Sequence, residues 1–164
     1  LLFRVGWDVL QDFGKTKKWI GGKIGATTIL HTWGQNLRYH PHLHCIVPGG
    51  ALMADGKWKH SRKRSRYLFK VDQLSSVYRP RFMEKTRELT KQGILNGRVP
   101  GNLFDRDWVV YAKRPLGGPR QVISSLGSYT HRTGISNDRI LEVNEEMVTY
   151  TWKDYSNNYC RNPA

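Results

Sequence analysis

Apolar residues recur at helical spacing in three segments of the chain, and each segment is predicted to form a helix. The first covers about residues 3–13, where Gly14 is expected to end it. The second runs over residues 71–92 and stops before a glycine, with Asp72 as the expected cap and Pro80 as an interruption. The third lies within residues 118–132, directly after a pair of glycines.

Other segments alternate apolar and polar residues or are rich in β-branched residues, which is typical of strands. The last two of them flank Asn144-Glu145 and are predicted to form a hairpin turned at that pair. The first two are close enough in sequence to form an antiparallel hairpin as well. The predicted strands cover residues 26–33, 42–50, 108–115, 139–143 and 147–153.

This order of elements indicates an α+β fold, with an antiparallel central sheet of four to five strands flanked by helices. A chain of 164 residues is long enough for one compact domain, and we expect a single domain over residues 1–164 with its core at about 26–155. The sequence opens on Leu1 rather than methionine, so it is expected to be a fragment of a longer protein.

Charge narrows the class of partner. The chain has 27 Lys and Arg against 13 Asp and Glu, a net charge of +14. A domain this basic favours a polyanion, and nucleic acid is preferred over an anionic membrane because the basic residues do not oppose an apolar helix face. No segment has the apolar length of a membrane span. Six basic residues gather between 57 and 66, where we expect a DNA-binding loop: Lys57, Lys59, Arg62, Lys63, Arg64 and Arg66.

The two cysteines, Cys45 and Cys160, are far apart and have no partner at the spacing of a metal clip. This argues against a disulfide scaffold or a zinc ribbon. It suits a reducing compartment, and a cytoplasmic protein is expected.

Four of the six histidines lie between residues 31 and 44. Because side chains two apart in a strand share a face, His42 and His44 are predicted to project together, which suits binding of one divalent metal ion. Pairing of the two strands would bring His31 to the same face as a third ligand, with Gln35 as the alternative. The competing interpretation is a set of hydrogen-bonded, half-buried histidines, and a His-x-His pair also occurs in cupin-like metalloenzymes.

Tyr129 lies near the end of the third predicted helix, beside His131 and Arg132. A phenol with a pKa of ~10 is a weak nucleophile at neutral pH, but it suffices when a metal ion polarises the attacked phosphodiester. The local sequence by itself favours the competing interpretation, a helix tyrosine that packs on the sheet.

Three blocks, "HTWGQNLRYHPHLHCIVPGGAL", "WVVYAKRPLGGPRQVISSLGSYTHRTGISNDRI" and "VTYTWKDY", occur in the order found in one known family. They resemble the rolling-circle insertion-sequence transposases of the HUH endonuclease superfamily (the insertion-sequence-ninety-one family), where HUH stands for His-hydrophobic-His. The resemblance runs from about Thr28 to Tyr155. The motif itself corresponds to His42-Leu43-His44.

The resemblance implies an HUH-type fold (RRM or ferredoxin-like) and a metal-dependent transposase that nicks and rejoins single-stranded DNA at transposon ends and targets. In such enzymes a helix tyrosine, here Tyr129, forms a 5′-phosphotyrosine link and leaves a free 3′-OH. Two HUH histidines and a third polar residue hold Mg²⁺ or Mn²⁺. Lys113 matches a lysine of the family and, with His131 and Arg132, is an expected DNA contact. A bacterial, nucleoid-associated protein is implied.

The chain departs from the family pattern before the tyrosine. Ser125 stands where many members have a first tyrosine, one helical turn earlier, and Ser128 replaces an arginine. This favours a single-tyrosine variant over a scheme with two nucleophiles. Two alternatives stay open: an inactive remnant that only binds single-stranded DNA, and a replication initiator or relaxase of the same superfamily. The sequence does not fix the oligomeric state.

Overall fold

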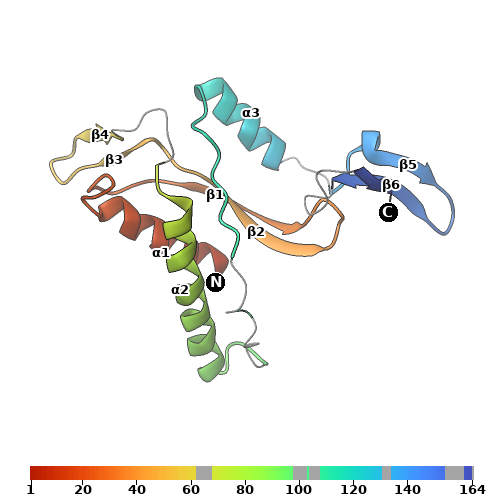
Figure 1. Ribbon diagram of the computed structural model, residues 1–164, viewed down its shortest axis with the longest axis horizontal. Helices are drawn as coiled ribbons and strands as arrows, with labels where there is room; N and C mark the ends of the chain where they lie inside the picture. The colour runs from red at the N-terminus through yellow and green to blue at the C-terminus, as the bar shows by residue number, and fades with distance from the viewer. Residues whose placement is uncertain (62–67, 98–102, 104–107, 131–133, 154–160, 164) are drawn as a thin grey trace. The chain divides into compact units, whose positions relative to one another are not determined.

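The computed structural model describes most of the chain as helices, strands and turns (Figure 1). It divides into two compact units, one of residues 1–28 and 45–117, the other of residues 29–44 and 118–164. The described residues are 1–61, 68–97, 103, 108–130, 134–153 and 161–163.

The three predicted helices are confirmed as α1 (Leu2–Lys15), α2 (Val71–Lys91) and α3 (Pro119–Thr130), followed by a 3₁₀ turn at Asn137–Arg139. No described helix is both long enough and apolar enough to cross a bilayer. Three details at the helices differ from expectation, and they concern Gly14, Asp72 and Pro80.

Gly14 lies inside α1 rather than ending it. A Cβ at this position would lie 2.7 Å from a side-chain carbon of Ile24, so glycine allows close packing instead of a helix stop. Asp72 is in the first turn of α2, and Lys70 occupies the cap position. Pro80 is exposed within an uninterrupted α2, which the buried Met83 anchors one turn later.

The α+β class is confirmed, and the described strands divide among three small sheets. Strands β1 (Thr27–Trp33) and β2 (Tyr39–Ile46) form the first sheet. The antiparallel pair β3 (Gly50–Leu52) and β4 (Trp58–His60) forms the second. The third contains β5 (Ile140–Val143), β6 (Val148–Lys153) and β7 (Arg161–Pro163), all antiparallel. The predicted turn at Asn144 is confirmed, because its side-chain oxygen accepts hydrogen bonds from the N–H groups of Glu146 and Met147.

The prediction of a strand over residues 108–115 is wrong, because this segment has no regular secondary structure. Its side chains still alternate between half-buried and exposed up to Lys113, which is why the sequence looks like a strand. Val109 is 93% exposed and Tyr111 is 78% exposed. The carbonyl of Trp108 accepts a hydrogen bond from the Ser75 hydroxyl, so a contact to α2 is made where a strand partner was expected.

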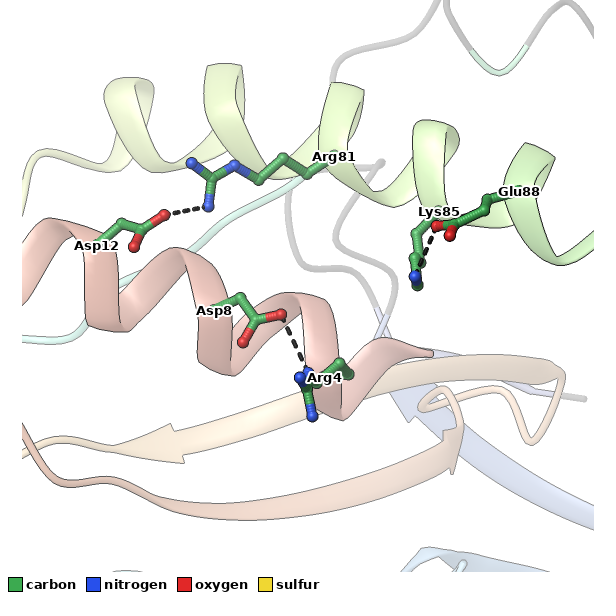
Figure 2. A network of polar contacts seen from close by, with 6 residues as sticks. All are labelled: Arg4, Asp8, Asp12, Arg81, Lys85 and Glu88. Atoms are coloured by element: carbon green, nitrogen blue, oxygen red, sulfur yellow. Dashed lines mark hydrogen bonds and ion pairs between the residues drawn. The ribbon is translucent and has the colours of Figure 1, made fainter.

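The core of the first unit lies between α1, the loop after it, and the β3–β4 sheet. Ile20, Ile24, Ala51 and Phe69 form the buried cluster. Helices α1 and α2 are also joined at their surface by an ion pair between Asp12 and Arg81 (Figure 2). Cys45 is a free, exposed thiol, and Cys160 lies outside the described residues.

Candidate metal centre

The four clustered histidines lie on the β1–β2 hairpin, within the second unit except for the strand ends. A tight turn joins the two strands: the Gly34 N–H donates to the Arg38 carbonyl at 2.9 Å, and the Leu37 N–H donates to the Gly34 carbonyl at 3.1 Å. Leu37 adopts a left-handed φ of 58°. Strand β2 begins at Tyr39, earlier than predicted, so the expected connection over residues 34–41 is shorter than the sequence suggested.

Three imidazoles converge on one face of this hairpin, as the alternation of strand side chains predicted. One potential ligand nitrogen from each of His31, His42 and His44 lies within 4.8 Å of the others. The ring centroids of His31 and His44 are 4.4 Å apart, and those of His42 and His44 are 4.9 Å apart. Two metal–nitrogen bonds of about 2.1 Å separate their nitrogens by at most ~4.2 Å, so a small rotation of the rings would complete a shared shell.

A hydrogen bond selects the nitrogen that His42 can offer. Its Nδ1 lies 2.7 Å from the backbone carbonyl oxygen of His40. A carbonyl oxygen only accepts, so Nδ1 carries the proton and donates it, which leaves the Nε2 lone pair of a neutral ring available. Histidines that bind metals usually have this arrangement, in which an outer hydrogen bond fixes tautomer and ring orientation.

The environment of the other two imidazoles restricts their motion. His31 is buried with 5% of its surface exposed, and its ring is parallel to the Trp33 indole, with 5.9 Å between centroids and 2° between planes. His44 is half-buried and its Nε2 atom is shielded from solvent. Three imidazoles with this spacing and restricted motion can bind a metal ion. Several divalent ions accept three nitrogen ligands.

The turn of the hairpin is held through its backbone carbonyls by Arg139, the last residue of the 3₁₀ turn, and by Tyr150 of β6. The Arg139 guanidinium donates to the carbonyl of Gln35 through Nη2 and to that of Thr151 through Nε. The Tyr150 hydroxyl donates to the carbonyl of Asn36 at 3.0 Å. The Arg139 guanidinium also lies over the Tyr150 ring, 5.8 Å from its centroid. Together these two side chains fix the end of the hairpin beyond His31 and His42.

We predict that Arg139→Ala loosens this turn without unfolding the protein. Loss of charge-assisted hydrogen bonds, each worth about 1.5–3 kcal/mol, should raise amide exchange of residues 34–38 roughly tenfold or more. Hydrogen–deuterium exchange with mass spectrometry measures this. Arg38→Ala is the matched control, because it removes an exposed arginine of the same turn. Equal amide exchange of residues 34–38 in both variants would contradict a role of Arg139 in holding this turn.

Other predicted site residues are placed only in part. Tyr129 is in the last turn of α3, and the position of its side chain lies outside what the structure describes. Ser125, one helical turn earlier, is half-buried. The predicted contacts His131, Arg132, Arg62, Lys63, Arg64 and Arg66 also lie outside the described residues.

The described basic residues differ in how available they are for DNA. Lys57 and Lys113 are exposed, and Lys57 lies 3.8 Å from the Asp55 carboxylate. The Lys59 ammonium instead donates to the Ile20 carbonyl at 2.8 Å, so it supports the first unit. The backbone carbonyl of Gln35, the alternative third ligand, accepts a hydrogen bond from the Arg139 guanidinium.

Sequence reasoning missed Trp33, Arg139 and Tyr150 as parts of this site. Trp33 had a detectable signal, since it is two residues after His31 in a strand and therefore shares its face. Arg139 and Tyr150 are more than 100 residues from the turn that they hold. No local pattern connects positions that far apart.

A family model described as "Putative transposase" matches residues 25–163. A relative named "Putative transposase y4qJ", from Sinorhizobium fredii, is 39% identical over 94% of this chain and 42% of its own length. The transposase for insertion sequence element IS801, from Pseudomonas savastanoi pv. phaseolicola, is 25% identical over 94% of this chain and 39% of its own.

This chain therefore spans about two fifths of the length of these two relatives. No solved structure gives a significant match. The family match covers nearly the whole chain and includes the histidine hairpin, α3 and the third sheet. The resemblance to insertion-sequence transposases is confirmed, and the chain belongs to this transposase family.

Proposed function

We propose that this chain is the catalytic core of a rolling-circle transposase, which nicks and rejoins single-stranded DNA through a covalent bond to Tyr129. The convergence of His31, His42 and His44 on one hairpin face supports this most strongly. Three neutral imidazoles suit a divalent cation, and transposase relatives make DNA the substrate to consider first.

The three histidines would hold Mg²⁺ or Mn²⁺, which when bound supplies positive charge at the scissile phosphate. The His42 hydrogen bond to the His40 carbonyl and the stacking of His31 on Trp33 keep these rings oriented before any ligand arrives. This preorganisation avoids a rearrangement at the moment of reaction.

In the proposed step, the Tyr129 oxygen attacks the phosphorus, and its proton passes to solvent or a nearby base. A bond from the Tyr129 oxygen to phosphorus forms, and the bond from phosphorus to the 3′ oxygen breaks and leaves a 3′-OH. The new phosphodiester keeps the bond energy, so attack by a 3′-OH can reverse the step without ATP. Ser125 lacks a phenol one turn earlier, which favours one covalent strand at a time.

Exposed basic residues would hold the DNA backbone. We include Lys57 and Lys113 among the described residues, and the basic loop with His131 and Arg132 from the sequence. Lys59 is the weakest candidate for a DNA contact, because its ammonium donates a hydrogen bond to the Ile20 carbonyl. A cytoplasmic location is a prediction from cysteine usage, and a bacterial one is a prediction from the family resemblance.

An oligonucleotide labelled at both ends tests the proposal. Single-stranded DNA from the ends of the element that encodes the chain is incubated with protein and Mn²⁺. The 3′ label should travel with the protein on a denaturing gel, the 5′-labelled fragment should be extendable at its 3′-OH, and EDTA should prevent both. DNA binding without an adduct under Mg²⁺ or Mn²⁺ would instead identify an inactive binding remnant, and transfer of the 5′ label would contradict the proposed linkage.

A further inference from the structure

A groove of about 390 Å³ lies between α1 and α2 in the first unit. The two helices pack against each other and carry most of its walls. Aromatic, cationic and hydrogen-bonding side chains share this space, among them Phe13, Lys18, Trp19, Gln73, Ser76 and Arg81.

The aromatic rings at the groove pack against one another. The Phe13 and Trp19 rings are stacked, with 6.0 Å between centroids and 21° between planes. Phe69 packs edge-on against both of them, at 5.6 and 5.9 Å. Trp19 is only half-buried, so part of its indole surface is accessible. Such a partly open indole is a stacking surface for a nucleobase.

Positive charge surrounds these aromatic rings. Lys15, Lys17 and Lys18 are exposed at the end of α1, and the Lys18 ammonium lies 5.6 Å from the centroid of the Trp19 ring. Asp12, the carboxylate that lines the groove, is paired with Arg81 (Figure 2). Its charge is therefore offset, and Lys18, which lines the groove, together with its sequence neighbours Lys15 and Lys17 gives this end of α1 a net positive potential.

We propose that the α1–α2 groove is a second binding site for single-stranded DNA, in which one base stacks on Trp19 and the flanking phosphates contact Lys17 and Lys18. The Gln73 amide lies in the same groove and supplies a donor and an acceptor for a base edge, whereas the Ser76 hydroxyl, which donates to the Gln73 carbonyl at 3.0 Å, supplies an acceptor. The inference rests on the proposed function for its choice of nucleic acid. Basic side chains beside an accessible aromatic ring are the usual composition of sites that bind single strands.

The test measures binding of a fluorescent oligothymidine to the full chain in EDTA, by anisotropy over a range of salt concentrations. Each phosphate contact on a single strand contributes about 0.7 to the slope of log affinity against log salt. The double variant Lys17→Ala/Lys18→Ala should therefore lower the slope by about 1.4. The control Lys85→Ala/Lys91→Ala loses the same charge from α2 and should change the slope by less than half as much.

A second variant tests the stacking. Trp19→Phe keeps an aromatic ring in the core and should weaken binding about three- to tenfold with an unchanged slope, since base–aromatic stacking carries no counterions. The proposal is overturned if both double variants lose the same slope, if Trp19→Phe binds like the wild type, or if oligouridine or duplex DNA binds more tightly than oligothymidine. Without metal there is no cleavage, so these outcomes are independent of adduct formation at Tyr129.

Discussion

Replacement of His42 by alanine is expected to abolish metal-dependent cleavage of single-stranded DNA and to leave salt-sensitive binding of that DNA largely intact. His42 provides one of three converging nitrogens, with its tautomer set by the His40 carbonyl. Outer-shell changes alone typically cost 10–100-fold in metal affinity, so loss of a direct ligand should cost roughly 100-fold or more. Binding in EDTA depends on charge, which this substitution does not change when the ring is neutral.

The measurements are Mn²⁺ affinity by calorimetry, adduct yield on a denaturing gel, and DNA affinity in EDTA. His31→Ala and His44→Ala should reproduce the His42→Ala result if all three are ligands. His60→Ala is the matched control, because it removes an imidazole from β4 in the first unit. Equal loss of cleavage and of DNA binding in His42→Ala would mean that His42 stabilises the fold and does not act as a metal ligand.

The elements with strong local patterns could be predicted from the sequence. Helices α1, α2 and α3 and the β5–β6 hairpin follow from apolar spacing and from the turn at Asn144, because these signals depend on neighbours in the chain. Gly14 was misread because a glycine at a helix stop and a glycine at a close contact look alike in sequence. Only the position of Ile24 across from it decides between them.

The segment at residues 108–115 shows the limit of strand patterns. Alternating burial exists there, but a strand also needs a partner for its N–H and C=O groups, and pairing is decided by residues far away in the sequence. The division of the strands among three small sheets is likewise decided by residues far apart in the sequence. Local alternation predicts that strands form, whereas their division among sheets is a long-range property.

The convergence of the three histidines was predictable for a specific reason. His42 and His44 share a face because strand side chains alternate, and His31 reaches them through the adjacent paired strand, so two short-range rules suffice. Arg139 and Tyr150 hold the turn through hydrogen bonds to backbone carbonyls. Every residue has a backbone carbonyl, so the amino-acid types in the turn give no sign of these contacts. These contacts can be recognised only in the folded structure, where Arg139 and Tyr150 reach the hairpin turn.

The second large effect is expected for Tyr129→Phe, which should reduce covalent adduct by three orders of magnitude or more. The substitution removes one oxygen, the atom proposed to bond to phosphorus, and keeps the ring in the last turn of α3. Metal affinity and DNA binding in EDTA should stay within about twofold of wild type, because neither depends on that oxygen. Adduct yield with Mn²⁺ and a 3′-labelled oligonucleotide measures the effect.

Tyr39→Phe is the decisive companion variant, because Tyr39 is the most exposed large hydrophobic residue of the histidine hairpin, at 82%. It is an odd-numbered position of β2, so its phenol projects from the face opposite to His42 and His44 and should be dispensable. Full activity in Tyr39→Phe together with loss in Tyr129→Phe assigns the nucleophile to α3. An adduct that persists in Tyr129→Phe and disappears in Tyr39→Phe would assign it to the hairpin, and would mean that Ser125 and Tyr129 are helix residues without a part in the chemistry.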